Sequence, residues 1–167
     1  MGVEGMDLET LSAQIGECLQ QRGLMLAAAE SCTGGWVAQA ITATPGSSQW
    51  FERGFVTYSS AAKLELLGVH PQTLKQHGAV SEPTVREMAE GALSRSHAQV
   101  AVAVSGIAGP GGGSLEKPVG TVCLAWAGIG METRTQCRFF LGNRDAVRRQ
   151  AVEAVLLGVL DLWRDRS

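Results

Sequence analysis

The sequence has few of the features that mark several common classes of protein. Lys and Arg number 14 against 16 Asp and Glu in 167 residues, and no basic run stands out. A nucleic-acid-binding protein usually shows a basic stripe, so this composition disfavours that class. Long apolar runs are also missing, because the longest uncharged stretches, 31–51 and 98–115, are interrupted by Gly and Pro. We therefore expect neither nucleic acid nor a membrane as a partner.

Cysteine motifs and a signal peptide are missing as well. The four cysteines form no C-x-x-C pair and have no zinc-ligand spacing: Cys18, Cys32, Cys123 and Cys137. An even count is compatible with disulfides, but a chain of this length can bury a core without them. The first residues carry Glu4, Asp7 and Glu9 and lack the basic-then-apolar layout of a signal peptide. We expect a soluble, cytoplasmic protein with reduced cysteines.

What the sequence does contain indicates one globular domain over residues 1–167, with its core at about 8–163. Hydrophobic residues make up 45% and charged residues 18% of the chain, which is the balance of a protein with a sizeable core. Glycine is abundant, at 21 residues, roughly twice its average share. Glycine-lined sites for phosphates or oxyanions are one reason for such an excess.

The alternation of expected elements predicts the fold class. Apolar periodicity and Gly or Pro breaks predict helices near 8–22, 36–42, 61–67, 81–93 and 144–163. Strands are expected near 24–29, 51–59, 100–105, 119–127 and 133–141. This order favours an α/β protein, a three-layer α/β/α sandwich with a mixed β-sheet.

The first candidate site is the segment from Glu30 to Gly35, where a buried strand passes into a helix. The turn would hold the Ser31 hydroxyl at the carboxyl edge of the sheet, the usual ligand edge of α/β folds. N–H groups at Thr33–Gly35 would then lie where they can receive an oxyanion. The alternative is that Ser31 or Thr33 is simply a helix N-cap.

A serine nucleophile needs a base, and the sequence offers few histidines. His70, His77 and His97 all lie in expected loops or helix ends. Lys63 lies among small and apolar residues, and burial lowers the pKa of a lysine so that it can act as the base. The alternative is a surface lysine. Residues 60–63 also match the S-x-x-K pattern, which makes Ser60 an alternative nucleophile, although S-D-N and K-T-G do not occur.

The third candidate is the segment from Ser105 to Gly113, with five glycines in nine residues directly after an apolar strand. Its N–H groups are suited to surround an anion. It is neither a P-loop nor a G-x-G-x-x-G fingerprint, and the alternative is a flexible connection. Arg144, at the start of the last helix, can reach a phosphate, and the alternative there is a solvated helix face.

Several strings in the same order closely resemble the CinA C-terminal domain family, which includes stand-alone nicotinamide-nucleotide amidases. They are AESCTGGW at 29–36, FERGFVTYS at 51–59, GAVSE at 78–82, SGIAGPGGG at 105–113, EKPVGT at 116–121 and NRDAVR at 143–148. The resemblance runs from about residue 8 to 160. Ser105 stands where many relatives have Thr, and Gly112 lies in a loop that often carries Asp at a neighbouring position.

The resemblance implies hydrolysis of the carboxamide of nicotinamide mononucleotide to nicotinate mononucleotide and ammonia, in pyridine-nucleotide recycling. It implies Ser31 as nucleophile, Lys63 as base and Tyr58 as an assisting hydroxyl, with no metal or organic cofactor. The expected substrate-binding residues are Thr33, Gly34, Gly35, Ser105, Gly106, Gly109, Gly111, Gly112 and Arg144. We expect a homo-oligomer, a dimer. A non-catalytic nucleotide-binding or regulatory module and a Ser60-dependent acyltransferase or amidase remain the alternatives.

Overall fold

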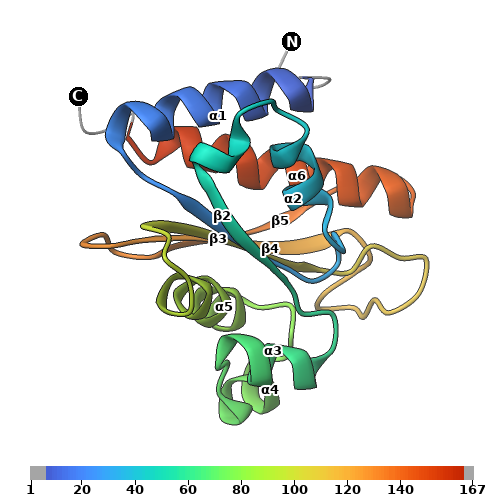
Figure 1. Cartoon of the computed structure of the whole chain (residues 1–167). Helices are drawn as coiled ribbons and strands as arrows, with labels where there is room; N and C mark the ends of the chain where they lie inside the picture. Colours follow the sequence, from blue (N-terminus) through green and yellow to red (C-terminus); the bar gives the residue numbers. More distant parts are fainter. Residues whose placement is uncertain (1–6, 164–167) are drawn as a thin grey trace.

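The structure, a computed structural model, describes residues 7–163 and contains a five-stranded mixed sheet (Figure 1). The strands are β1 (Leu26–Glu30), β2 (Phe51–Val56), β3 (Val100–Gly106), β4 (Thr121–Gly128) and β5 (Arg134–Phe139). Their order is β2-β1-β3-β4-β5, with β1 parallel to β2 and β3, and β4 antiparallel to β3 and β5. The predicted mixed sheet is confirmed.

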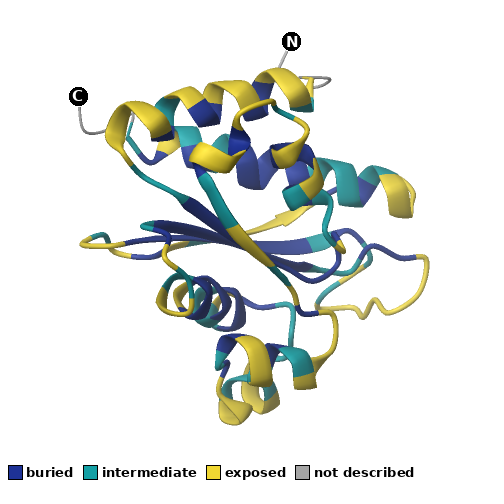
Figure 2. Cartoon of the chain, in the orientation of Figure 1, coloured by how far each residue is buried: buried dark blue, intermediate teal, exposed yellow. Residues whose placement is uncertain are grey.

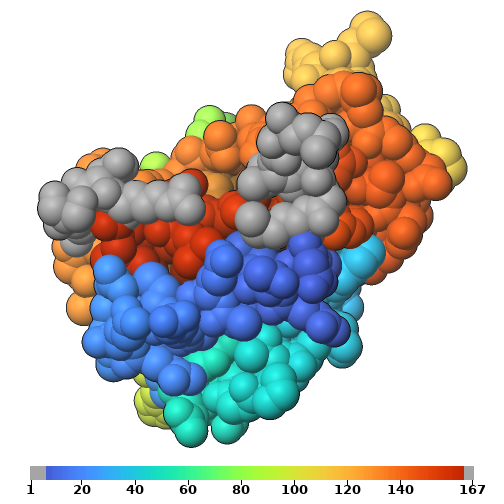
Figure 3. Space-filling view, turned by 90° about the horizontal axis from the view of Figure 1, so that it is seen from above, coloured from blue at the N-terminus to red at the C-terminus, as the bar shows by residue number. Residues whose placement is uncertain are grey.

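Helices cover both faces of this sheet, which confirms the predicted sandwich (Figure 1). On one face lie α1 (Leu8–Arg22), α2 (Trp36–Thr42) and α6 (Arg144–Asp161), with the short 3₁₀ helix η1 (Ser47–Gln49) nearby. On the other lie α3 (Ser60–Leu67), α4 (Pro71–His77) and α5 (Glu82–Ser94). The helices turn their buried residues toward the sheet (Figure 2), and α1 packs alongside α6 in the view from above (Figure 3).

The apolar strands explain why the layers form. The burial pattern of β3 is buried throughout apart from its last residue, because both faces are covered. Its even-numbered valines face α1, α2 and α6, while its alanines, such as Ala101 and Ala103, leave room for α5 to pack closely. The helix ends follow the sequence signals: Asp7 caps α1 and Gly23, with φ of 66°, ends it.

Two elements differ from the sequence-based expectation. Helix α4 was not predicted, because its seven residues contain a single apolar side chain, Leu74, and so show no periodicity. Strand β2 ends at Val56 rather than at residue 59. Residues 57–59 instead form a short connection, and Ser59 caps α3 by accepting a hydrogen bond from the N–H of Ala62.

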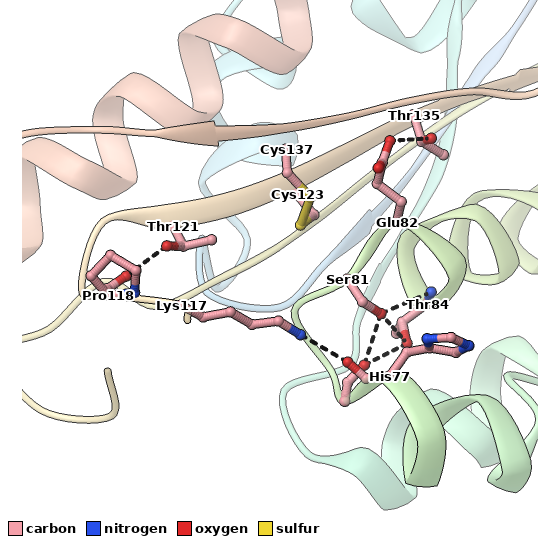
Figure 4. Close-up of a disulfide and its surroundings, with 11 residues drawn as sticks. His77, Ser81, Glu82, Thr84, Lys117, Pro118, Thr121, Cys123, Thr135 and Cys137 are labelled. Carbon is pink, nitrogen blue, oxygen red and sulfur yellow. Dashed lines mark hydrogen bonds between the residues drawn. A yellow bond between two sulfur atoms is a disulfide. The ribbon is translucent and has the colours of Figure 1, made fainter. Parts of the chain in front are cut away.

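The expectation of four reduced cysteines is wrong for one pair. Cys123 on β4 lies directly opposite Cys137 on β5, and the two form a disulfide (Figure 4). They lie fourteen positions apart in the sequence, so only the strand register reveals that they face each other. Cys18 and Cys32 are free thiols. Within residues 7–163, no helix combines the length and apolar character that crossing a membrane requires.

The topology gathers the candidate segments at one edge of the sheet. The carboxyl ends of β1, β2 and β3 lead into residues 31–35, 57–59 and 107–120, respectively. The last of these segments, the glycine-rich loop, projects from the body of the molecule (Figures 1 and 3). Ligands of open α/β sheets bind at this edge.

Candidate active site

Ser31 is held firmly at the end of strand β1, which lies between β2 and β3 in the sheet. Its N–H donates to the carbonyl of Val104 on β3 (3.0 Å), which continues the parallel pairing by one residue. On the other side, the N–H of Thr57 donates to the carbonyl of Glu30 (2.8 Å). The strands on both sides therefore fix the backbone position from which the Ser31 side chain extends.

Glu30, the last residue of β1, organises the turn that follows Ser31. Its side chain is 1% exposed, and Oε1 accepts hydrogen bonds from the Thr33 hydroxyl (2.6 Å) and the Val37 N–H (2.8 Å). Oε2 accepts from the N–H of Ala38 (3.0 Å). A carboxylate here pairs the free N–H groups at the start of α2 and lies at the positive end of the helix dipole. The carboxylate thus anchors α2 to the strand that carries Ser31.

The Gly34–Gly35 pair lets the chain turn sharply between Ser31 and α2. Their φ angles are 59° and 107°, in the left-handed region that side chains with a Cβ rarely adopt. The N–H of Gly34 donates to the carbonyl of Ser31 (3.0 Å), and the N–H of Gly35 donates to Glu30 (3.1 Å). The glycines are therefore needed for the shape of the turn.

Lys63 reaches Ser31 from α3, which lies on the face of the sheet opposite to α2. Its side chain is 1% exposed, and its Nζ lies 2.8 Å from Ser31 Oγ, 2.8 Å from the Thr57 carbonyl and 3.3 Å from the Tyr58 carbonyl. Burial lowers the pKa of Lys63, because the ammonium form loses its hydration. Ser60 is not among the hydrogen-bond partners of Lys63 within the described chain.

The three neighbours of Lys63 Nζ can each accept one N–H of an ammonium, and they also suit a neutral amine that acts as a base. A neutral amine has two N–H donors and one lone pair. When the amine is neutral, the carbonyls of Thr57 and Tyr58 can accept its two N–H groups, which leaves the lone pair for the third neighbour, the Ser31 hydroxyl. This arrangement can remove the hydroxyl proton of Ser31.

A pocket of about 280 Å³ opens above this pair. Its lining comes from the carboxyl ends of β1, β2 and β3 and the segments that follow them, from α3, from the connection between α4 and α5, and from the start of α6: Ser31, Cys32, Tyr58, Ser60, Lys63, Ala79, Val80, Ser105, Gly106, Ile107, Ala108, Gly109, Gly111, Gly112 and Arg144. None of these lining residues carries a carboxylate, whereas Arg144 contributes a positive charge. The pocket is thus suited to a ligand with an anionic group.

Arg144 and Tyr58 meet at the rim of the pocket. The Arg144 guanidinium donates to the Gly109 carbonyl (2.8 Å) and to the Tyr58 hydroxyl (3.2 Å), so α6 is linked to the glycine-rich loop. The Tyr58 side chain is 61% exposed. The backbone carbonyl of Tyr58 is what contacts Lys63, while its hydroxyl lies with Arg144.

The sequence predicts that the N–H groups of Thr33–Gly35 receive an oxyanion, and the structure shows the surroundings of these residues. The N–H groups of Gly34 and Gly35 are engaged within the turn, and none of the three residues lines the pocket. Cys32, the residue after Ser31, does line it. Thr33, Gly34 and Gly35 therefore shape the turn, whereas Ser105, Gly106, Gly109, Gly111, Gly112 and Arg144 are brought to the pocket.

The amino-acid sequence matches a known protein family. The profile of the CinA C-terminal domain matches residues 8–163. The chain belongs to the CinA C-terminal domain family. The resemblance of the sequence motifs to this family is thereby confirmed.

Relatives of this CinA C-terminal domain include both short and long proteins. It is 59% identical over 150 residues to the nicotinamide-nucleotide amidohydrolase PncC of Escherichia coli K12, covering 90% of this chain and 91% of that one. It is 53% identical to the PncC of Pseudomonas putida, covering 93% and 96%. A CinA-like protein of Akkermansia muciniphila is 58% identical, but there the match covers 87% of this chain and 35% of the relative.

Solved structures share the fold of this domain. The competence/damage-inducible protein CihA of Agrobacterium tumefaciens superposes with a TM-score of 0.90 at 46% identity, covering 93% of this chain and 94% of that one. A CinA superfamily protein of Klebsiella pneumoniae gives a TM-score of 0.90 at 39% identity, covering 93% and 97%.

The structure of this domain also shows contacts around the candidate site that the sequence did not indicate. Glu30 lies inside a recognisable motif, but its hydrogen bonds to α2 depend on the turn geometry. Arg148, on α6, donates to the carbonyls of Cys32 and Thr33 (3.0 and 3.1 Å), more than one hundred residues away. The sequence offered one signal for the position of Arg148: it follows Arg144 by four residues, and residues i and i+4 share a helix face. Among residues 7–163, no cluster of His, Cys, Asp or Glu is suited to hold a metal ion.

Proposed function

We propose that this protein is a nicotinamide-nucleotide amidase that hydrolyses the carboxamide of nicotinamide mononucleotide to nicotinate mononucleotide and ammonia. The observation that carries the proposal is the 2.8 Å approach of Ser31 Oγ to the buried Lys63 Nζ at the base of the pocket. The close relatives named as nicotinamide-nucleotide amidohydrolases support the choice of substrate.

Acylation begins with Ser31. Neutral Lys63 accepts the hydroxyl proton while Ser31 Oγ forms a bond to the carboxamide carbon, which gives a tetrahedral intermediate. Lys63, now an ammonium, donates its proton to the amide nitrogen. The carbon–nitrogen bond breaks and ammonia leaves, so that the nicotinoyl group remains as an ester on Ser31. Neutral Lys63 is regenerated in the same step.

Deacylation uses the same pair in reverse. Lys63 takes a proton from a water molecule as the water oxygen attacks the ester carbon, and it then returns that proton to Ser31 Oγ. The products are nicotinate mononucleotide and the free enzyme. One buried lysine thus performs every proton transfer of the cycle, and neither a metal ion nor an organic cofactor takes part.

The negative oxygen of the tetrahedral intermediate needs a hydrogen-bond donor close to Ser31. The N–H of Cys32 is suited to this role, because it belongs to the residue after the nucleophile and Cys32 lines the pocket. Burial raises the pKa of the Cys32 thiol to about 11, so the side chain stays neutral and does not compete as a nucleophile.

The rest of the substrate lies along the glycine-rich loop. Gly109, Gly111 and Gly112 present backbone groups to the pocket, and Arg144 adds a cation beside them. We place the 5′-phosphate here, because an arginine and clustered backbone N–H groups are the usual partners of a phosphate. The Tyr58 hydroxyl, held by Arg144, then faces the ribose-phosphate half of the substrate rather than the carboxamide.

The proposal also covers the extent of the domain, its location in the cell and its oligomeric state. We propose that the chain acts as one domain over residues 1–167, in the cytoplasm, and as a dimer. Residues 1–6 and 164–167 of that domain lie outside the described structure. Light scattering on the purified protein measures its oligomeric state.

The proposed function is tested by incubating purified protein with nicotinamide mononucleotide and following ammonia and nicotinate mononucleotide. We expect equal amounts of the two products from the parent protein. Ser31→Ala should lower turnover by several orders of magnitude, as expected for a lost nucleophile, whereas Ser60→Ala should retain most of it. Binding without ammonia release would instead indicate a non-catalytic nucleotide-binding module, and a loss confined to Ser60→Ala would indicate the Ser60 mechanism.

A further inference from the structure

Arg148 lies directly behind the turn that carries the proposed nucleophile. It is one helical turn after Arg144 on α6, and its guanidinium donates from Nε to the Cys32 carbonyl (3.0 Å) and from Nη2 to the Thr33 carbonyl (3.1 Å). The guanidinium also lies over the Trp36 ring, 5.3 Å from its centroid. It is therefore held in one orientation by the turn and by the first residue of α2.

A chain of hydrogen bonds leads from this guanidinium to the pocket. Arg148 binds the carbonyl of the peptide unit that joins Thr33 to Gly34. The N–H of that unit, on Gly34, donates to the Ser31 carbonyl (3.0 Å). The Ser31 carbonyl belongs in turn to the peptide unit whose N–H is that of Cys32. Two peptide units in series thus connect the charge of Arg148 to the N–H beside the nucleophile.

Such a chain has an electrostatic consequence. The carbonyl and the N–H of a trans peptide unit point in opposite directions, so a fixed carbonyl also fixes the direction of its N–H. A hydrogen bond from a cation polarises the peptide unit that accepts it, and bonds in series strengthen one another. The Cys32 N–H at the end of the chain is therefore both oriented and made a stronger donor.

We propose that Arg148 is a positioning residue for the proposed reaction, which aligns and polarises the Cys32 N–H toward the oxyanion through the Thr33–Gly34 and Ser31–Cys32 peptide units. The proposal rests on the proposed function, because the oxyanion forms on the carbonyl that Ser31 attacks. Arg148 does not line the pocket, so its effect falls on the transition state rather than on substrate binding.

Two substitutions and one matched control test this role. Arg148→Met keeps a long side chain but removes both hydrogen bonds and the charge. Arg148→Lys keeps the charge but lacks the two-pronged geometry. Arg149→Met is the control, since Arg149 is the adjacent residue on α6 and pairs with Glu153 (2.8 Å). Thermal melts of all three variants report their folding.

The first measurement is the kinetics of nicotinamide mononucleotide hydrolysis. We expect Arg148→Met to lower kcat by at least about tenfold, since removal of a single oxyanion donor costs about 10²- to 10³-fold. KM should change little. Arg148→Lys should fall between the parent and Arg148→Met, and Arg149→Met should match the parent.

The second measurement is the rate at which a fluorophosphonate labels Ser31, followed by mass spectrometry. In this reaction Ser31 Oγ forms a bond to phosphorus, fluoride leaves, and Lys63 takes the hydroxyl proton. The phosphoryl oxygen occupies the position of the oxyanion. The rate constant does not depend on how much of the sample is folded, so a merely structural loss would lower the labelled fraction but not the rate constant. We expect the rate constant of Arg148→Met to fall in parallel with kcat.

Several results would overturn the positioning role. They are equal kcat and labelling rates for Arg148→Met and Arg149→Met, a loss confined to KM, or parent activity in Arg148→Lys. A parent protein that is labelled at Ser31 but does not hydrolyse nicotinamide mononucleotide would overturn the proposed substrate alone, and the labelling rates would still decide the role of Arg148. A parent protein that shows neither reaction would overturn both proposals.

Discussion

Lys63 Nζ and Ser31 Oγ lie 2.8 Å apart although the two residues are separated by a strand, two helical segments and a sheet crossover. The pairing of β1 with β2 brings Thr57 beside Glu30, and the short connection to α3 then carries Lys63 back under Ser31. Sheet register rather than local sequence therefore sets the distance between the proposed nucleophile and its base.

The pH dependence of activity follows from the state of Lys63. Below its pKa the side chain is an ammonium, which has no lone pair and cannot accept the Ser31 proton. Because burial lowers this pKa from its usual value, kcat/KM should rise with pH through the lowered pKa and level off before the range in which an exposed lysine titrates, about 10.4. Initial rates across a pH series measure this. A kcat/KM that falls as the pH rises through the lowered pKa of Lys63 would contradict the base role.

Recognition of the substrate phosphate should depend on Arg144. Nicotinamide riboside lacks the phosphate, so we expect a much lower kcat/KM for it than for the mononucleotide. Arg144→Met should raise KM for the mononucleotide at least about tenfold, as for loss of a charge-assisted hydrogen bond, and should change the riboside kinetics little. Steady-state kinetics of both proteins on both substrates form the test. Equal losses on the two substrates would show that Arg144 does not contact the phosphate.

Glu30 should support both stability and turnover. In Glu30→Gln one carboxylate oxygen becomes an NH₂ group, so either the Ala38 N–H or the donors on Oε1 would face another donor. We expect a loss of about 1–3 kcal/mol in the free energy of unfolding together with a lower kcat, because the turn after Ser31 loses its anchor. Chemical denaturation and kinetics measure the two effects.

The matched control for Glu30 is Glu82, which accepts one hydrogen bond from Thr135 (2.8 Å) far along the sheet (Figure 4). A glutamine can still accept that bond, so Glu82→Gln should leave stability and kcat near the parent values. If Glu30→Gln behaves like Glu82→Gln, the carboxylate does not anchor the turn.

The layers of the fold were predictable because each depends on a local signal. The apolar run of β3, the Asp7 cap and the Gly23 stop are visible in the chain itself. Helix α4 was not predictable, since its stability comes from tertiary contacts and from Glu87, which accepts from the His70 N–H (2.9 Å) and the Thr73 hydroxyl (2.6 Å). The Cys123–Cys137 bond likewise depends on strand register.

The candidate site was predictable in its residue types but only partly in its contacts. Ser31 and the Gly34–Gly35 turn follow from the strand-to-helix junction. Which N–H groups remain for an oxyanion depends instead on the side chain of Glu30, which occupies the donors at the start of α2. Lys117 Nζ donates a hydrogen bond to the His77 carbonyl (2.8 Å) and so connects the glycine-rich loop to α4 (Figure 4). The two residues are forty positions apart, so no local sequence pattern indicates this contact.

The most direct test of the account is kcat for Lys63→Arg beside Lys63→Ala, with folding of both variants confirmed by thermal melts. Arginine keeps a positive charge but holds its proton beyond about pH 12, so it cannot accept one from Ser31. The account predicts that both variants lose turnover to a similar extent, with partial recovery of Lys63→Ala by added small primary amines. Substantial turnover in Lys63→Arg would contradict it and leave Lys63 as a charge that positions the substrate.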